Sequence, residues 1–195
     1  MSVRRRHLWT NKILGLSQKA SRPKNICADS YAFQGFILGI DPSLRSTGFA
    51  VIEICDHQKI NLHTSSTLKL SPQLDFVACL GELFKTTQHL LQSYPVRTVS
   101  MEQTIYVQNS KVAQILGSCR GACLAATALS NIETKEYAPR RIKKSITGMG
   151  QATKEQMAKM VYQLLQLPRI LPPDESDATA AALCHFFSLK SLLPS

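Results

Sequence analysis

The order of hydrophobic patterns along the chain predicts an α/β fold with one five-stranded mixed sheet flanked by helices. Two observations lead to this prediction. Three strand-like segments follow one another through short turns, which is typical of an antiparallel meander. Further strand-like segments then alternate with segments of helical length and spacing, which is typical of crossovers onto parallel strands. The expected order is therefore βββαβαβ, followed by more helices.

The first three strands are expected at residues 36–40, 47–54 and 58–70. FILGI is a short apolar run that ends at Asp41-Pro42, a dipeptide that favours a turn. TGFAVIEI is a second apolar run, and QKINLHTSSTLKL alternates between apolar and polar residues. Short connections make these three strands antiparallel neighbours.

The second half of the sheet is expected to alternate with helices. The apolar spacing and the breaks in it indicate a helix from Pro72 to about Tyr94, a strand at 96–101, a helix at 109–129 and a strand at 132–137. Three helices complete the chain: a short one after Pro139, one that Thr153 caps and that ends near Leu167, and one from Asp174 to near Leu189.

The N-terminal region differs in composition from the rest. Residues 1–36 hold seven basic residues and one acid, with little periodicity. Three interpretations stay open: a basic arm that contacts the DNA backbone, an organellar transit peptide, or an overlong start-codon assignment. We expect a basic extension at 1–35, one folded domain at 36–188 and a short tail at 189–195.

Net charge indicates the class of partner. The chain carries 23 Lys and Arg against 13 Asp and Glu, a net charge of +10. A basic protein of this kind binds a polyanion, either nucleic acid or an anionic membrane. No apolar run approaches the length that crosses a bilayer, so we expect no membrane partner. The six cysteines form no CxxC pair, which argues against a zinc site and fits a reducing cytoplasm.

Four carboxylates are expected to meet at one edge of the sheet. Asp41 ends the first strand and Glu102 ends the fourth, so both emerge at the same edge if these strands are parallel neighbours. Asp174 and Asp177 are three apart, which places them on one helical face. Converging carboxylates repel unless cations neutralise them, and hard oxygen ligands select magnesium or manganese. Two such ions can catalyse phosphodiester hydrolysis.

Each acid also has a structural interpretation. An Asp-Pro pair after a strand is a common turn, and acids in a first helical turn complement the helix dipole. The four acids together, in this strand and helix order, favour the catalytic interpretation.

Five separated segments resemble, in order and in register, the RuvC family of Holliday-junction resolvases. They are GIDPSLRSTGFAVIE (39–53), MEQTIYVQNS (101–110), GSCRGACLAA (117–126), EYAPRRIKKSITGMGQATKEQM (136–157) and DESDATAAALCHF (174–186). The resemblance implies an RNase H-like nuclease domain, a homodimer, and magnesium-dependent paired nicking of four-way DNA junctions during recombination and repair.

The resemblance also implies roles for individual residues. The family's four catalytic carboxylates, which hold its metal ions, fall on Asp41, Glu102, Asp174 and Asp177. Its conserved lysines near the scissile phosphate fall on Lys143 and Lys154. We expect Mg²⁺ as the cofactor, two ions per site, with Mn²⁺ as the alternative.

Basic residues next to these positions are candidates for DNA contact. Six of them lie between residues 140 and 159 and are opposed by a single acid, Glu155, and phosphate contacts from such residues dominate DNA affinity. The alternative is an ordinary solvated helix face. The DNA-contact candidates among the cations are Arg120, Arg140, Arg141, Lys143, Lys144 and Lys154.

Two positions depart from the family pattern. Ser43 stands where the family usually has glycine, and it would strain the turn if a positive φ is needed there. Ile105, with Tyr106 beside it, stands where the family has an aromatic residue on a loop at the junction centre. An apolar wedge can still part stacked bases, so Ile105 and Tyr106 are expected to contact DNA.

Other functions and partners stay open at this stage. The chain could be an RNase H-fold nuclease acting on another branched or hybrid substrate, a junction-binding module without catalysis, or an organelle-targeted resolvase. The small-residue segment 111–126 is a candidate dimer interface, with packing against its own sheet as the alternative. A branch-migration helicase is a further expected partner, and the expected location is the nucleoid in the cytoplasm.

Overall fold

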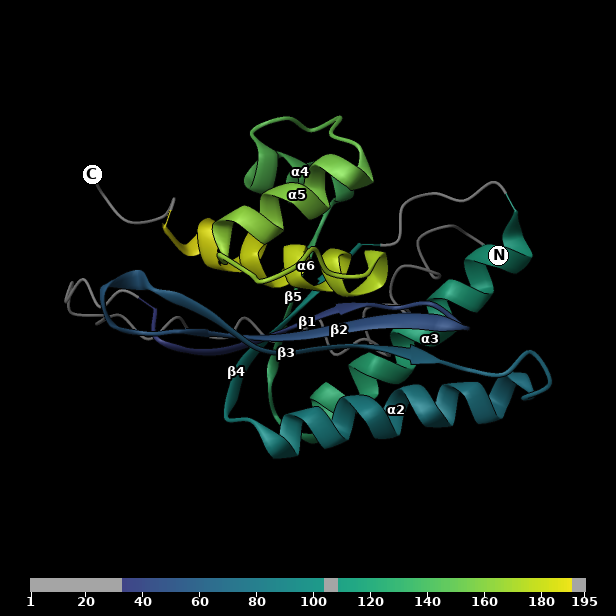
Figure 1. Ribbon diagram of the computed structural model, residues 1–195. Coiled ribbons are helices and arrows are strands. Elements are labelled where there is room, and N and C mark those ends of the chain that lie inside the picture. The colour runs from purple at the N-terminus through teal and green to yellow at the C-terminus, as the bar shows by residue number, and fades with distance from the viewer. Residues whose placement is uncertain (1–32, 104–108, 191–195) are drawn as a thin grey trace, which may run out of the picture. The chain divides into compact units, whose positions relative to one another are not determined.

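The computed structural model describes residues 33–103 and 109–190, which form one mixed sheet with helices on both faces (Figure 1). Strands β1 (Gly35–Asp41), β2 (Ser46–Ile54) and β3 (Ile60–Lys69) form the antiparallel part. Strands β4 (Val96–Glu102) and β5 (Glu133–Tyr137) extend it in parallel beyond β1, giving the order β3-β2-β1-β4-β5. The predicted α/β fold, with a five-stranded mixed sheet and the order βββαβαβ along the chain, is confirmed.

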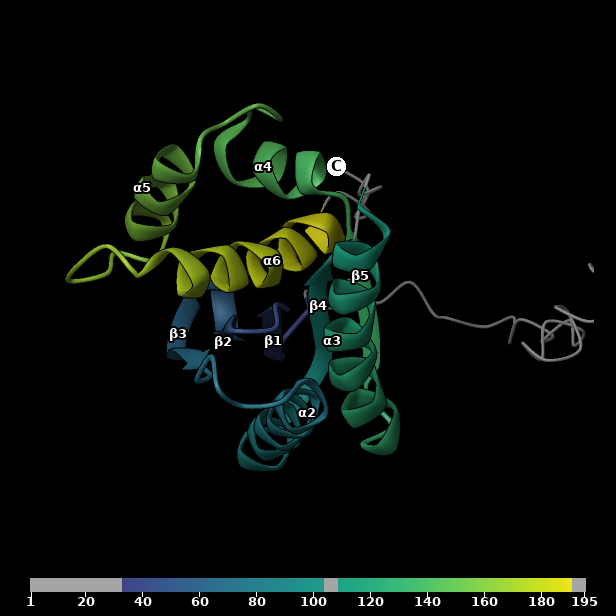
Figure 2. The same cartoon turned by 90° about the vertical axis from the view of Figure 1, so that its right-hand side faces the viewer.

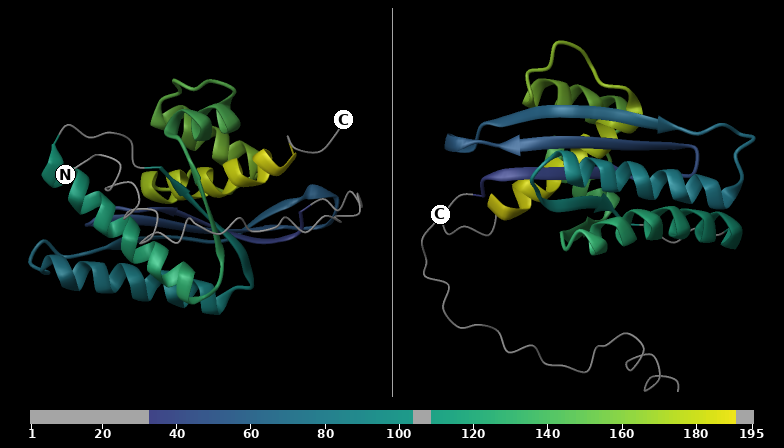
Figure 3. Two further views of the ribbon diagram at one scale, coloured as in Figure 1. Left: turned by 180° about the vertical axis from the view of Figure 1, so that it is seen from behind. Right: turned by 90° about the horizontal axis from the view of Figure 1, so that it is seen from below.

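The helices lie in layers. The long helices α2 (Phe76–Ser93) and α3 (Ser110–Leu129) cover one face of the sheet, as the view from below shows (Figure 3). Helix α6 (Pro173–Lys190) covers the other face, and α4 (Pro139–Thr147) and α5 (Lys154–Leu164) pack on its outer side (Figure 2). Since the middle of α6 is enclosed by the sheet and two helices, residues 178–186 are all buried and mostly apolar, whereas the acids of the helix are confined to its first turns.

Several observed boundaries differ from the predicted ones, among them the end of α5, which lies at Leu164 and not near Leu167. Helix α2 begins at Phe76 and not at Pro72, because the Asp75 carboxylate accepts a hydrogen bond from the backbone N–H of Ala78 (2.9 Å) and caps the helix there. A short 3-10 helix (Asp56–Gln58) precedes β3, which therefore starts at Ile60. Helix α6 reaches Lys190, two residues into the expected tail.

Two glycines allow α6 to lie directly on the sheet. A Cβ atom at Gly39 would stand 2.0 Å from the carbonyl oxygen of Ala178, and one at Gly48 would stand 1.9 Å from the carbonyl oxygen of Asp174. Real Cβ atoms do not approach backbone this closely, so any side chain here would push α6 away. These glycines set the height of the first turns of α6 above β1 and β2.

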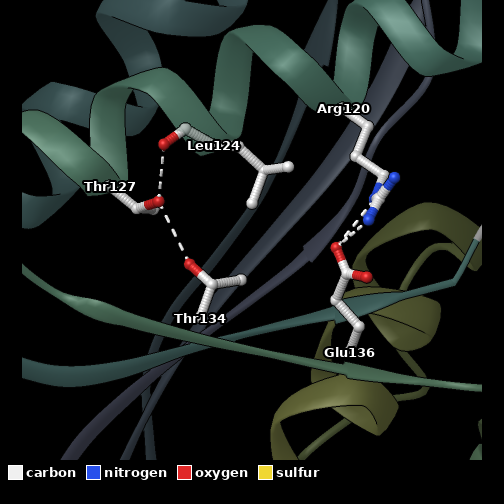
Figure 4. Close-up of polar contacts among 5 residues, drawn as sticks. All are labelled: Arg120, Leu124, Thr127, Thr134 and Glu136. Atoms are coloured by element: carbon white, nitrogen blue, oxygen red, sulfur yellow. Dashed lines mark hydrogen bonds and ion pairs between the residues drawn. The ribbon is translucent and has the colours of Figure 1, made fainter. Parts of the chain in front are cut away.

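Helix α3 corrects one expectation. By length and composition alone it could cross a membrane, with a mean hydropathy of 1.3 over its most apolar window, of which 22% is buried. The expectation that no segment approaches this length is therefore wrong. A single such helix is weak evidence for a membrane span, and here α3 packs against α2 and β5. Arg120 in its middle forms an ion pair with Glu136 of β5 (Figure 4).

We predict that Gly48→Ala lowers the free energy of unfolding by about 1–3 kcal/mol, because the added methyl group overpacks the contact with α6. Denaturant titration would measure this loss. Gly81→Ala on α2 is the matched control, since a Cβ atom there meets nothing within 4 Å. It should leave stability unchanged or raise it by up to about 1 kcal/mol through helix propensity. Equal stability of the two variants would contradict the proposed close contact.

Candidate active site

The sheet topology brings Asp41 and Glu102 to one edge. Strands β1 and β4 are parallel, with Ile40 beside Met101, so the next residue of each strand is one of the two acids. Both side chains are half-buried. The prediction that these carboxylates emerge together from neighbouring parallel strands is confirmed.

The acids of α6 lie over the same edge. Asp174 and Asp177 occupy the first turns of the helix, which the glycines hold close to β1 and β2. The Ser46 hydroxyl donates a hydrogen bond to Asp174 Oδ2, and Lys154 Nζ donates one to Asp177 Oδ2 (2.8 Å). Each helix carboxylate therefore has a partner on another element.

A cleft of about 240 Å³ opens at this edge. Three acids and two lysines that the sequence singled out line it together. They are Asp41, Glu102, Asp177, Lys143 and Lys154, with apolar walls from Pro139, Ile142, Met157 and Ala180. The fourth acid, Asp174, is turned toward Ser46 and is not part of the lining.

The carboxylates perturb one another. The pKa of Asp41 is raised to about 7, first by burial and then by the neighbouring charges of Asp177, Glu102 and Asp174, against the attraction of Lys154. Burial and Asp177 also raise the pKa of Glu102. The pKa of Lys154 is raised by its hydrogen bond to Asp177 and by the charges around it. The positive charge of Lys154 therefore does not balance the negative charges around Asp41.

A divalent cation would supply that missing charge. The four donors are hard carboxylate oxygens, which suit magnesium or manganese. In the described ranges, no three His, Cys, Asp or Glu side chains are already placed as a ligand set. Asp174 is hydrogen-bonded to Ser46 and Asp177 to Lys154. The carboxylates thus share a site electrostatically, and side-chain rotations would be needed to close it around an ion.

The turn after Asp41 is not strained by Ser43. Its φ is not positive, so the expected penalty for replacing glycine does not arise. Instead the Ser43 hydroxyl donates to the Ser46 carbonyl oxygen (2.9 Å), and the Ser43 backbone N–H donates to Thr47 Oγ1 (3.0 Å). Serine is accommodated here as part of a compact turn.

Two of the predicted DNA-contact arginines have partners within the protein. Arg120 pairs with Glu136 across α3 and β5 through both Nε and Nη2 (Figure 4). Arg141 donates to Ser188 Oγ (3.1 Å), and its guanidinium lies 5.0 Å from the centre of the Tyr137 ring. Both side chains therefore contribute to packing, which the charge pattern alone did not reveal.

The other basic candidates lie nearer to open surface. Lys143 lines the cleft, and Lys144 is exposed on α4. Arg140 lines a separate hollow of about 630 Å³ with the exposed Met149. The candidates Ile105 and Tyr106 lie outside the described residues, as does the basic extension up to residue 32.

Sequence reasoning missed three contributors to the site: Ser46, Gly39 and Gly48. Glycine inside two adjacent strands was an available signal, because it often marks a close backbone approach. Nothing in the sequence pattern indicated that Ser46 would bind Asp174, since the two are 128 positions apart.

We predict that the metal-free protein loses stability as pH rises from about 4 to 7, because Asp41 must ionise at a cost in the folded state. Its folded pKa lies above its unfolded value, so its stabilising contribution is complete below pH 3.8 and is lost through about pH 7. The upper bound is about 4 kcal/mol. Thermal melts of the wild type and of Asp41→Asn in the presence of a chelator would isolate the contribution of Asp41 ionisation to stability. Parallel pH profiles of the two proteins would argue against it.

Comparisons with known proteins agree with this geometry. The family model described as "Crossover junction endodeoxyribonuclease RuvC" matches residues 37–185. A curated relative with that name from Halorhodospira halophila is 40% identical over 149 residues, covering 76% of this chain and 88% of its own. One from Ehrlichia ruminantium is 36% identical over 157 residues, covering 80% and 98%.

Solved structures are similar over the same region. Thermus thermophilus RuvC gives a TM-score of 0.73 at 27% identity, covering 80% of this chain and 96% of its own. The same protein in complex with a Holliday junction substrate also gives 0.73, at 25% identity. The yeast mitochondrial resolvase Ydc2 shares the fold, with a TM-score of 0.62 at 14% identity. The fold is thus the expected RNase H-like one, and the chain belongs to the RuvC family of crossover junction endodeoxyribonucleases.

Proposed function

We propose that this protein resolves four-way DNA junctions by nicking two opposing strands, as an endodeoxyribonuclease. One observation carries the proposal. A half-buried carboxylate, Asp41, lies among further acids at the ends of two parallel strands, and Lys143 and Lys154 share its cleft. Like charges held close together destabilise the fold, so a purely structural site gains nothing from them. A site that binds cations and a phosphodiester needs such charges to hold the cations.

In this proposal Asp41, Glu102, Asp174 and Asp177 hold two magnesium ions, with manganese as the alternative. Bound cations would activate water and neutralise charge on the leaving oxygen. Lys143 and Lys154 are placed to contact the non-bridging oxygens of the phosphate. Lys154 would be free to bind the substrate phosphate if Asp177, its present hydrogen-bond partner, held a cation. The apolar walls of the cleft limit the access of bulk water.

We predict that Glu102→Gln reduces the rate of junction cutting by more than about 100-fold, since even outer-shell changes at metal sites cost 10- to 100-fold. The assay is nicking of a labelled synthetic four-way junction in Mg²⁺. Linear duplex, flapped DNA and an RNA–DNA hybrid serve as competing substrates. Glu82→Gln is the matched control, because Glu82 pairs with Lys85 on the exposed surface of α2, away from the cleft.

The assay separates the alternatives. Paired nicks by the wild type and by Glu82→Gln, but not by Glu102→Gln, support the proposal. Tight junction binding without cutting would favour a binding module, and preference for a flap or hybrid would favour another nuclease of this fold. Calorimetric titration of Mg²⁺ into Asp41→Asn should show weakened binding.

We further propose that the protein acts as a homodimer through α3. The junction is nearly two-fold symmetric, so a two-fold dimer would present one site to each of two opposing strands. On α3, a Cβ atom at Gly117 or Gly121 would meet nothing within 4 Å, and Ala125 and Ala128, which lie on the same helical face, are exposed. These features give the helix an open, largely apolar face of small residues, which suits a close contact with a second copy.

We predict that Gly117→Arg converts the protein to a monomer, because a long charged side chain would separate the two copies of α3. Light scattering coupled to size exclusion would measure the mass. Gly81→Arg on α2 is the control, since it makes the same change at an equally open helical position. A monomeric wild type, or a Gly117→Arg variant that stays dimeric, would contradict this interface.

The partners and location follow from the substrate in this proposal. Acting on junction DNA, the protein would work at the nucleoid in the cytoplasm, beside a branch-migration helicase. If residues 1–35 are instead a transit peptide, it would work on organellar DNA. Mass spectrometry of the mature N-terminus distinguishes the two locations.

A further inference from the structure

A second cavity lies beside the catalytic cleft. It has a volume of about 310 Å³, at the lower end of the range for ligand pockets. Its lining residues come from the first turns of α5 and α6 and from the connection that joins these helices. Four of its lining residues are apolar: Ala158, Ile170, Leu171 and Pro173. The other four are polar or charged: Lys154, Glu155, Ser176 and Asp177. Mixed walls of this kind suit a flat ring that has apolar faces and a polar edge.

The cavity and the cleft share a wall. Lys154 and Asp177, joined by a 2.8 Å hydrogen bond, line both of them. A phosphate held by Lys154 in the cleft would therefore be one side chain away from the second cavity. A ligand that occupies both spaces must have an anionic part and an apolar ring a short distance apart.

The cavity also contains an unused polar group. Ser176 on α6 is 2% exposed, and its Oγ is the one buried side-chain oxygen or nitrogen without a hydrogen-bond partner among the described residues. An unpaired buried hydroxyl destabilises a fold. The hydroxyl can both donate and accept, and one rotamer change would redirect it toward a ligand in the cavity.

We propose that this cavity receives an unstacked nucleobase from the nucleotide next to the scissile phosphate, and that Ser176 reads its polar edge. A nucleotide combines the required anion and ring. Bases at a branch point lose part of their stacking, which lowers the cost of turning one out of the helix. The proposal rests on the junction-cutting function above and adds to it a determinant of cleavage-site preference.

The first test follows the base directly. Junctions carry 2-aminopurine at either position flanking the cut phosphate, and Ca²⁺ replaces Mg²⁺ to allow binding without cutting. Wild-type protein should raise the fluorescence several-fold, because unstacking relieves quenching. Ala158→Phe, which fills the cavity, should abolish the rise. Leu164→Phe, on the same helix but outside the cavity, should retain it.

The second test measures preference. Junctions that differ only in the base beside the cut are compared in Mg²⁺ with wild type and Ser176→Ala. Loss of the hydroxyl should reduce the ratio of cutting rates between the fastest-cut and the slowest-cut junction by about tenfold. The thermal midpoint should not fall, because the removed group has no partner among the described residues.

The outcomes separate this inference from the proposed function. No fluorescence rise at either position, or a rise with Ala158→Phe equal to that of wild type, overturns the base pocket. An unchanged cutting preference in Ser176→Ala overturns it as well. A wild type that cuts no junction overturns the proposed function alone, since the fluorescence in Ca²⁺ still reports whether the cavity holds a base.

Discussion

The close contact between α6 and the sheet is the constraint on which the rest of the structure depends. Gly39 and Gly48 carry no side chains, so the helix backbone rests directly on β1 and β2. This contact encloses α6 between the sheet and α4 and α5, and it explains why the middle of the helix is built from alanines. The same contact sets Asp174 and Asp177 beside the end of β1. The same helix–sheet contact therefore determines both the packing of the core and the position of the acids.

That placement concentrates negative charge where the fold alone gains nothing from it. The pKa of Asp41 rises to about 7 because burial and three other carboxylates all disfavour its charge. In the absence of a cation, Ser46 and Lys154 relieve part of this repulsion by binding Asp174 and Asp177. The two partners differ in character. Ser46, at the start of β2, is a neutral donor, whereas Lys154 is a cation that could also bind a phosphate.

Most of the fold could be predicted from the sequence, because apolar periodicity directly reflects burial. The end of β1 at Asp41, the end of β4 at Glu102 and the Thr153 cap of α5 all carry local signals. Contacts between distant segments carry none. The pairing of Arg120 with Glu136 depends on how α3 lies over β5, and the same residue in a charge pattern looks like a DNA contact.

The distinction between paired and open cations changes how the net charge of +10 should be interpreted. Arg120 is neutralised by the Glu136 carboxylate, so it contributes little to a field that attracts DNA. Arg141 is exposed and keeps its full charge, because its partners Ser188 and Tyr137 are neutral. Lys143, at the cleft, and Lys144, on the exposed side of α4, remain close to the site. Within the folded domain, affinity from phosphate contacts is therefore expected to concentrate around the cleft and α4, while six of the ten net positive charges lie in residues 1–36. A protein that must select a branch point among long stretches of duplex benefits from this, because fewer distant phosphate contacts leave a larger share of the binding energy at the branch.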